Sequence, residues 1–90
     1  MKPDQAATLA IRALAFLASD EDTLGRFLGT TGMDPTDLRA GVDDPAVLAG
    51  VLDFLLSDEP LLLQFCAAAG VRPEEPQRAR VQLPGFMPRD

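Results

Sequence analysis

Carboxylates are the side chains of this sequence that are best suited to chemistry, and many of them occur in three short groups. Asp20-Glu21-Asp22, Asp43-Asp44 and Asp58-Glu59 could bind a hard cation or supply a carboxylate pair for acid–base catalysis. None of the groups has the alternating spacing of a calcium loop, and each stands where a helix is expected to begin. Acidic side chains at such positions cap free backbone amides, so capping is the preferred interpretation.

The other side chains that catalysis usually needs are missing or badly placed. The chain has no histidine, which removes Ser-His-Asp and Cys-His mechanisms and most zinc sites. The single cysteine, Cys66, lies in an apolar run that predicts a buried structural thiol. Gly25, Gly29 and Gly32 follow no strand, so they form no phosphate-binding loop. We therefore expect no enzyme activity, no catalytic residue, no cofactor and no metal.

Composition limits the class of protein and of partner. A chain of 90 residues, 47% hydrophobic and 24% charged, is expected to form one globular domain over 1–90. Its net charge of −6 repels phosphate backbones and anionic lipids, so we expect no nucleic acid and no membrane partner. The apolar stretch 47–71 is broken by Ser57-Asp58-Glu59-Pro60, the start does not read as a signal peptide, and one cysteine allows no internal disulfide. The sequence therefore predicts a cytoplasmic protein.

Hydrophobic periodicity and helix start and stop signals predict an all-α fold of about six helices. The helix over 58–69 is apolar on nearly every side, which predicts a central and buried position. No segment alternates with the period of a strand, so no sheet is expected. The expected helices are 5–18 with Asp4 as its N-cap, 20–31, a short one from Asp34-Pro35 through Leu38, one from Asp44-Pro45 through Leu55, 58–69, and a last one from Pro73 or Pro76 to Leu83.

An internal repeat relates the two halves of the chain. When the sequence is shifted by 38 residues, the segment 14–21 aligns with 52–59. The repeated unit is a long helix, an acidic corner, a second helix, a glycine stop and a short third helix. Copy one covers about 5–42 and copy two about 45–83, followed by a tail over 84–90. The matched pairs are Leu14 with Leu52, Phe16 with Phe54, Leu17 with Leu55, Ser19 with Ser57, Asp20 with Asp58, Glu21 with Glu59, Phe27 with Phe65, Gly32 with Gly70 and Pro35 with Pro73.

The repeat leads to expectations about packing. Two copies are too few for an open solenoid, so they are expected to close on each other in a pseudo-two-fold or HEAT-like arrangement, or to bury a face in a homodimer. The matched phenylalanines should form two related pairs in the core. Gly32 and Gly70 should each end a helix in a Schellman motif. The last helix is expected to start late or be irregular, because Arg72 is a poor N-cap and Pro76 disfavours a helical Glu75.

The copies differ most in their third helices and in the tail, where a partner could bind. Phe86 and Met87 stand between two prolines and cannot continue a helix; they either dock on the protein's own surface, the preferred interpretation, or form a short linear motif for a partner. The C-terminal end is also weakly basic, for which ordinary solvated helix charge is the preferred explanation. The candidate partner-binding residues are Arg78, Arg80, Phe86 and Met87.

A longer pattern carries a family resemblance. It comprises Leu14-x-Phe16-Leu17-x-x-Asp20, Leu24-x-x-Phe27-Leu28-x-x-Thr31-Gly32-Met33-x-Pro35-x-Asp37-Leu38-Arg39 and Val51-Leu52-Asp53-Phe54-Leu55-Leu56-x-Asp58-Glu59. This pattern resembles an uncharacterised family of small helical proteins of alphaproteobacteria, a domain of unknown function, over about 5–85. The resemblance implies a cytoplasmic bacterial setting and no mechanism.

The function is therefore unknown from the residues alone. Our leading hypothesis is a non-catalytic helical module that binds an unidentified protein partner, with the groove between the two copies and the tail as its binding surface. The alternative is a carrier that encloses a small apolar ligand in its leucine-rich interior.

Overall fold

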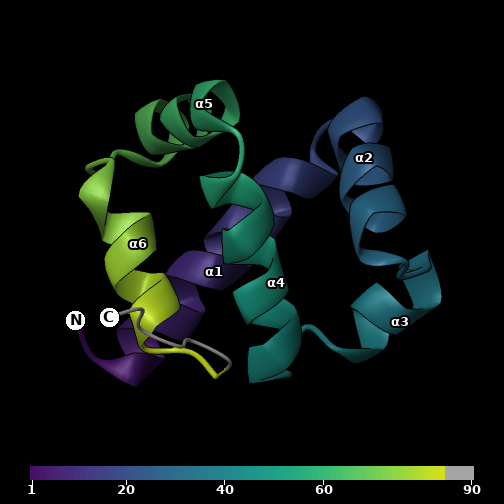
Figure 1. The fold of residues 1–90 in the computed structure, drawn as a ribbon, viewed down its shortest axis with the longest axis horizontal. Coiled ribbons are helices and arrows are strands. Elements are labelled where there is room, and N and C mark those ends of the chain that lie inside the picture. Colours follow the sequence, from purple (N-terminus) through teal and green to yellow (C-terminus); the bar gives the residue numbers. More distant parts are fainter. Residues whose placement is uncertain (85–90) are drawn as a thin grey trace.

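Six α-helices form the part of the chain that the computed structural model describes, residues 1–84 (Figure 1). No strand occurs in this range, which confirms the predicted all-α class. The helices are α1 (Pro3–Ala18), α2 (Glu21–Thr31), α3 (Pro35–Ala40), α4 (Pro45–Leu56), α5 (Glu59–Ala69) and α6 (Glu74–Val81).

Four of these helices begin at an aspartate whose side chain accepts a hydrogen bond from a backbone N–H of the first turn. This bond satisfies one of the amides that have no partner inside the helix. The acidic groups at the starts of α2, α4 and α5 therefore cap helices, as predicted. The caps are Asp20 for α2, Asp34 for α3, Asp44 for α4 and Asp58 for α5, and they accept from Thr23, Asp37, Ala46 and Leu61, respectively.

Two helix starts differ from the prediction. The first helix starts before Asp4: Lys2 is its N-cap, and the Gln5 side chain accepts the Lys2 backbone N–H at 2.9 Å. The last helix starts at Glu74 and is regular, although Pro76 follows Glu75. Proline is tolerated in a first turn, where its missing N–H costs nothing. The Glu75 carboxylate also accepts the Arg72 N–H at 2.6 Å. The start beside Pro73 is thus the earlier of the two predicted starts, and the expected delay or irregularity is not seen.

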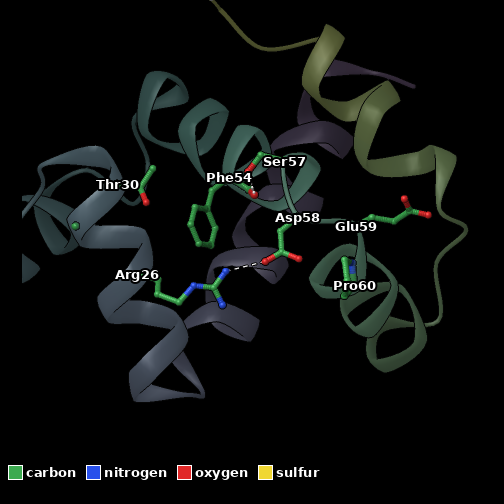
Figure 2. A pocket seen from close by; sticks show the side chains of 8 residues that line it. Arg26, Thr30, Phe54, Ser57, Asp58, Glu59 and Pro60 are labelled. Carbon is green, nitrogen blue, oxygen red and sulfur yellow. Dashed lines mark hydrogen bonds and ion pairs between the residues drawn. The ribbon is translucent and has the colours of Figure 1, made fainter.

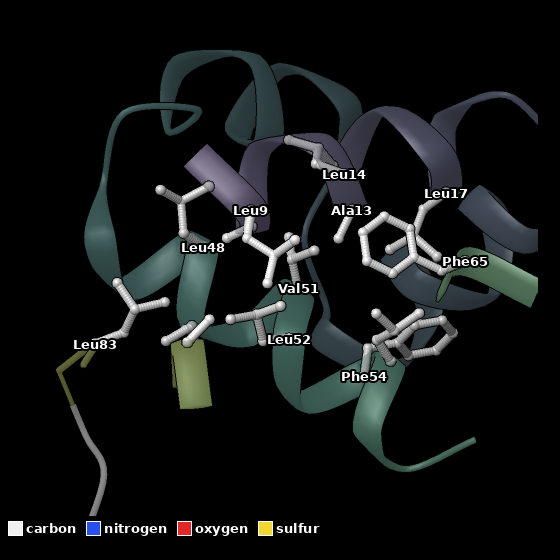
Figure 3. Close-up of a cluster of buried hydrophobic side chains, with 14 of the residues drawn as sticks. Leu9, Ala13, Leu14, Leu17, Leu48, Val51, Leu52, Phe54, Phe65 and Leu83 are labelled. Carbon is white, nitrogen blue, oxygen red and sulfur yellow. The ribbon is translucent and has the colours of Figure 1, made fainter. Parts of the chain in front are cut away.

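The hydrophobic core lies around α4, which contacts α1, α2, α5 and α6 (Figures 1 and 3). The α4 residues that are buried against these neighbours are apolar. Leu48, Val51, Leu52 and Leu55 are almost completely buried. The α1 helix crosses α4 and contributes a buried stripe with helical spacing that includes Leu17. The crossing of α1 and α4 is therefore the centre of the fold, because α1 also contacts four helices, α2, α4, α5 and α6.

Helix α5 is peripheral, so the prediction of a buried central helix at this position was wrong. It packs on α4 and α1 through one face, in which Leu61, Phe65 and Cys66 are buried. The opposite face is in solvent although it is apolar, and Leu63 is 47% exposed. An apolar composition does not distinguish a buried helix from one that exposes alanine and leucine, because exposed apolar residues are common on protein surfaces.

The four matched phenylalanines form two edge-to-face pairs, and each pair joins the two copies. Phe16 of α1 meets Phe65 of α5 with ring centroids 5.5 Å apart, and Phe27 of α2 meets Phe54 of α4 at 5.4 Å. In the repeat alignment Phe16 matches Phe54 and Phe65 matches Phe27, so the two pairs correspond to each other. Edge-to-face pairs contribute about 0.5–1.5 kcal/mol beyond the burial of their area. The predicted pairing is confirmed, and it holds the copies to each other.

Glycine ends both second helices in the left-handed conformation. Gly32 ends α2 with φ of 74°, and Gly70 ends α5 with φ of 70°. At Gly70 the glycine N–H donates to Cys66 O, and the next N–H, of Val71, donates to the same oxygen at 3.1 Å, which is the 6→1 bond of a Schellman motif. At Gly32 only the glycine N–H reaches back, to Leu28 O at 2.9 Å. The Schellman prediction is thus correct for the second copy, whereas the first copy has the simpler left-handed cap.

Candidate functional site

A groove of about 650 Å³ opens between α2 and the corner that joins α4 to α5 (Figure 2). We call it the corner groove. It is open to solvent, and both copies of the repeat contribute to its wall. Its lining residues from copy one are Arg26, Gly29 and Thr30, and those from copy two are Phe54, Ser57, Asp58, Glu59 and Pro60.

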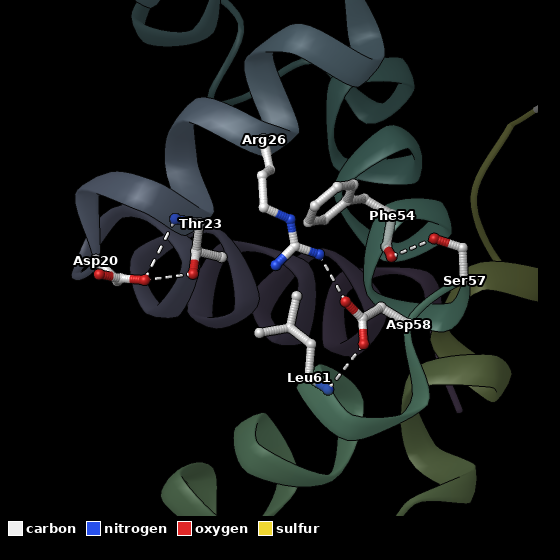
Figure 4. A network of polar contacts seen from close by, with 7 residues as sticks. All are labelled: Asp20, Thr23, Arg26, Phe54, Ser57, Asp58 and Leu61. Carbon is white, nitrogen blue, oxygen red and sulfur yellow. Dashed lines mark hydrogen bonds and ion pairs between the residues drawn. The ribbon is translucent and has the colours of Figure 1, made fainter.

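An ion pair between the two copies lies in this groove. Arg26 Nη2 of α2 donates to Asp58 Oδ2, the N-cap of α5, at 2.7 Å. The guanidinium carbon also stands 5.8 Å from the centre of the Phe54 ring, within the range of a cation–π contact (Figures 2 and 4). The Arg26 side chain is 57% exposed and that of Asp58 is 26% exposed. The groove therefore holds a guanidinium between an aromatic ring and a carboxylate while leaving it accessible.

The corresponding aspartate of the first corner has different partners. Asp20 Oδ2 accepts both the backbone N–H and the hydroxyl of Thr23, whereas Asp58 Oδ1 accepts the Leu61 N–H and its Oδ2 accepts Arg26 (Figure 4). The Thr23 hydrogen bonds are the main cause that lowers the pKa of Asp20, and the Arg26 hydrogen bond is the main cause that lowers the pKa of Asp58. Both carboxylates are held ionised at neutral pH.

Comparison with protein families assigns the chain to a family. Residues 3–86 match the family described as "Protein of unknown function (DUF3572)". The chain belongs to the DUF3572 family. Neither the curated proteins nor the solved structures include a match to it.

Two further open hollows occur on this DUF3572 chain. One, of about 440 Å³, lies between α1 and the start of α6 and includes Arg12, Val71 and Arg78. The other, of about 360 Å³, lies between α1 and α5, beside the Phe16–Phe65 pair. Arg12 lines both hollows, and its Nη2 donates to Ala69 O at 2.7 Å, which ties α1 to the end of α5.

The residues predicted to bind a partner are not brought together within the described part of the chain. Arg78 is exposed on α6. Arg80 is only 12% exposed: its Nε donates to Asp53 at 2.6 Å, and its Nη1 donates to the carbonyls of Leu83 and Pro84. This guanidinium therefore holds the end of α6 to α4. Phe86 and Met87 lie outside the described residues, so their role stays a prediction, as does binding by Arg78 and Arg80.

Sequence reasoning missed the corner groove, although the groove between the copies was named as a candidate surface. Its acidic residues were explained as caps, which is correct but incomplete. A signal was available in the repeat alignment, because Arg26 aligns with Gln64 and Thr23 with Leu61. These substitutions change the donors around the two capping aspartates, and so they distinguish the second corner from the first.

The remaining candidate chemistry is structural. Cys66 is buried, and burial raises the pKa of its thiol, so it is protonated at neutral pH. Within residues 1–84, no three cysteine, aspartate or glutamate side chains are grouped so that they could hold a metal ion. None of the described helices combines the length and the apolar character needed to cross a membrane.

Proposed function

We propose that this DUF3572 chain is a non-catalytic protein-interaction module that binds its partner in the corner groove. The observation that carries the proposal is the composition of the groove, in which residues of both copies surround one aromatic ring with charged groups. Protein interfaces typically combine an aromatic or arginine anchor with a polar rim. The Phe27–Phe54 pair joins α2 to α4, so the two walls of the groove are held together without the exposed ion pair.

The ionisation of the side chains supports a role without catalysis. A general acid at neutral pH needs a raised carboxyl pKa, and a nucleophilic cysteine needs a lowered thiol pKa. Asp20 and Asp58 have lowered pKa values and Cys66 has a raised one. These shifts are the reverse of those that a carboxylic general acid or a nucleophilic thiol requires.

Photo-crosslinking from the groove tests the proposal. A photoreactive amino acid replaces Thr30, which is exposed in the groove, and in a matched control it replaces Thr36, which is exposed on α3. The full chain is irradiated in its native cells. We expect a stoichiometric protein adduct at Thr30 and none at Thr36. Equal adducts at both positions, or none at either, contradict the proposal. A chain that ends at Leu83 shows whether the predicted tail residues add to the adduct yield.

The carrier and homodimer predictions can be tested separately. The carrier hypothesis needs an enclosed apolar cavity, whereas the three hollows described above open to solvent; native mass spectrometry of the purified chain would detect a retained ligand. A homodimer would appear as a doubled mass in sedimentation equilibrium. The cytoplasmic location and bacterial origin also stay predictions from the sequence.

A further inference from the structure

The two capping aspartates differ in how their second hydrogen bond is supplied. At the first corner the Thr23 hydroxyl, from the same helix, supplies it to Asp20. At the second corner Leu61 stands in the position of Thr23 and has no side-chain donor. Asp58 Oδ2 therefore accepts from a guanidinium of another helix. The capping carboxylate of the second corner thus takes its second hydrogen bond from a cation on another helix.

Arg26 fills this position but is not held firmly in it. The only side-chain hydrogen bond that Arg26 makes within residues 1–84 is the one to Asp58. More than half of the side chain is in solvent. Exposed ion pairs of this kind contribute little to stability. The aligned residue of copy two is Gln64, which shows that the repeated framework does not need arginine at this place. Arg26 can therefore leave Asp58 at low cost.

The charge of the groove favours a second cation. Arg26 carries the one positive charge of the lining, against the two carboxylates of Asp58 and Glu59, so the lining has a net charge of −1. Glu59 is exposed and makes no ion pair or side-chain hydrogen bond within residues 1–84. The whole chain carries −6, which attracts basic surfaces and repels acidic ones. The Phe54 ring is largely buried, and the face that it turns to the groove is in contact with the Arg26 guanidinium, so an incoming guanidinium would take the place of Arg26 there.

We propose that the corner groove receives an arginine side chain from a basic segment of a partner protein, which pairs with Asp58 and displaces Arg26, while Glu59, whose carboxylate points away from Asp58, adds negative charge at the rim (Figure 2). This inference rests on the proposed function and specifies the chemistry of the partner. Arg26 is then an internal occupant that competes with the partner for the same carboxylate.

An NMR titration of the full chain with two synthetic peptides tests this inference. One peptide has an arginine between two leucines, and the other has citrulline, which keeps the shape and removes the charge. With the arginine peptide we expect saturable amide shifts that centre on Thr30, Ser57 and Glu59 and that are absent with citrulline. Equal binding of the two peptides, or shifts spread over the whole surface, would overturn the proposal.

Three variants sharpen the titration. Glu59→Gln should weaken binding of the arginine peptide about two- to fivefold, the loss expected for one exposed charge interaction. Asp43→Asn, which removes one exposed acid outside the groove, should leave binding unchanged. Arg26→Gln should tighten binding about two- to fivefold, because it removes the competing exposed ion pair. A weaker complex with Arg26→Gln, or equal losses with Glu59→Gln and Asp43→Asn, contradicts the inference.

The two proposals fail in different ways. A partner adduct at Thr30 together with no binding of the arginine peptide rejects the basic occupant and leaves the interaction module standing. Binding of the arginine peptide in the groove without any specific adduct at Thr30 rejects the protein-interaction function in the cells tested, while the recognition of arginine is retained.

Discussion

The corner between α1 and α2 and the corner between α4 and α5 have the same framework but different partners. In both, the corner serine donates its hydroxyl to the carbonyl of the preceding phenylalanine, from Ser19 to Phe16 at 2.6 Å and from Ser57 to Phe54 at 2.7 Å. In both, the next residue is the N-cap of the following helix. The first corner then satisfies its aspartate locally, whereas the second uses Arg26 from the other copy. The repeated residues thus build both corners, and Arg26, which has no counterpart in copy two, distinguishes the second corner from the first.

The largest expected effects come from the phenylalanine pairs, which join the copies. Phe27→Ala and Phe65→Ala, at fully buried positions, should each lower the free energy of unfolding by about 3–5 kcal/mol. Phe16→Ala should cost less, because this ring is half-buried. Urea unfolding followed by circular dichroism measures these losses. Since both pairs cross between the copies, each variant should keep a single transition; two separate transitions would show that the copies fold independently.

The helix-ending glycines are the next largest test of the comparison. Gly32→Ala and Gly70→Ala should each cost about 1–2 kcal/mol, because a Cβ strains the left-handed conformation. Gly70→Ala should cost more, since the N–H groups of both Gly70 and Val71 donate back to Cys66 O. Gly25→Ala is the matched control: it lies inside α2 with no atom near the added Cβ, so it should stabilise the chain by up to about 1 kcal/mol. A neutral Gly32→Ala would show that the positive φ is not required.

The sequence predicts local features of this fold much better than the contacts between its elements. Helix starts at Asp20 and Asp58 and stops at Gly32 and Gly70 follow from caps and backbone conformation, which depend on a few neighbouring residues. The exposed position of α5 depends on which helices reach it in space. Hydrophobic content cannot report this, because an alanine-rich face is tolerated both in a core and in solvent.

The candidate site was predictable only in part for the same reason. The repeat alignment shows that Arg26 has no counterpart in copy two, but nothing local indicates that its guanidinium reaches Asp58, 32 residues later in the chain. Arg80, a candidate for binding a partner, likewise gives no local sign that its guanidinium meets Asp53 within the chain. Contacts of long side chains between helices depend on the packing of the helices, which periodicity does not specify.

Acid titration should weaken both corners. The pKa values of Asp20 and Asp58 are lowered from 3.8 in the folded chain, so the unfolded chain takes up protons first as the pH falls. Their contribution to stability is fully present above the unfolded value of about 3.8 and is lost as the pH falls through the folded values. The double variant Asp20→Asn/Asp58→Asn, in which asparagine can still cap, should therefore lose less stability than the wild type between pH ~5 and ~2. Identical pH profiles in urea unfolding would contradict these shifts.

The variant expected to change stability least distinguishes the two corners most directly. Arg26→Gln places in α2 the residue that copy two has at the aligned position, and it should change the free energy of unfolding by less than about 1 kcal/mol, because the ion pair is exposed. It should raise the pKa of Asp58 towards its ordinary value and change that of Asp20 little, since Thr23 is the main cause there. Thr23→Val should raise the pKa of Asp20 and change that of Asp58 little. Side-chain carboxyl NMR titration of the two variants measures both values, and a shift of both aspartates in either variant would mean that the corners are electrostatically coupled rather than independently capped.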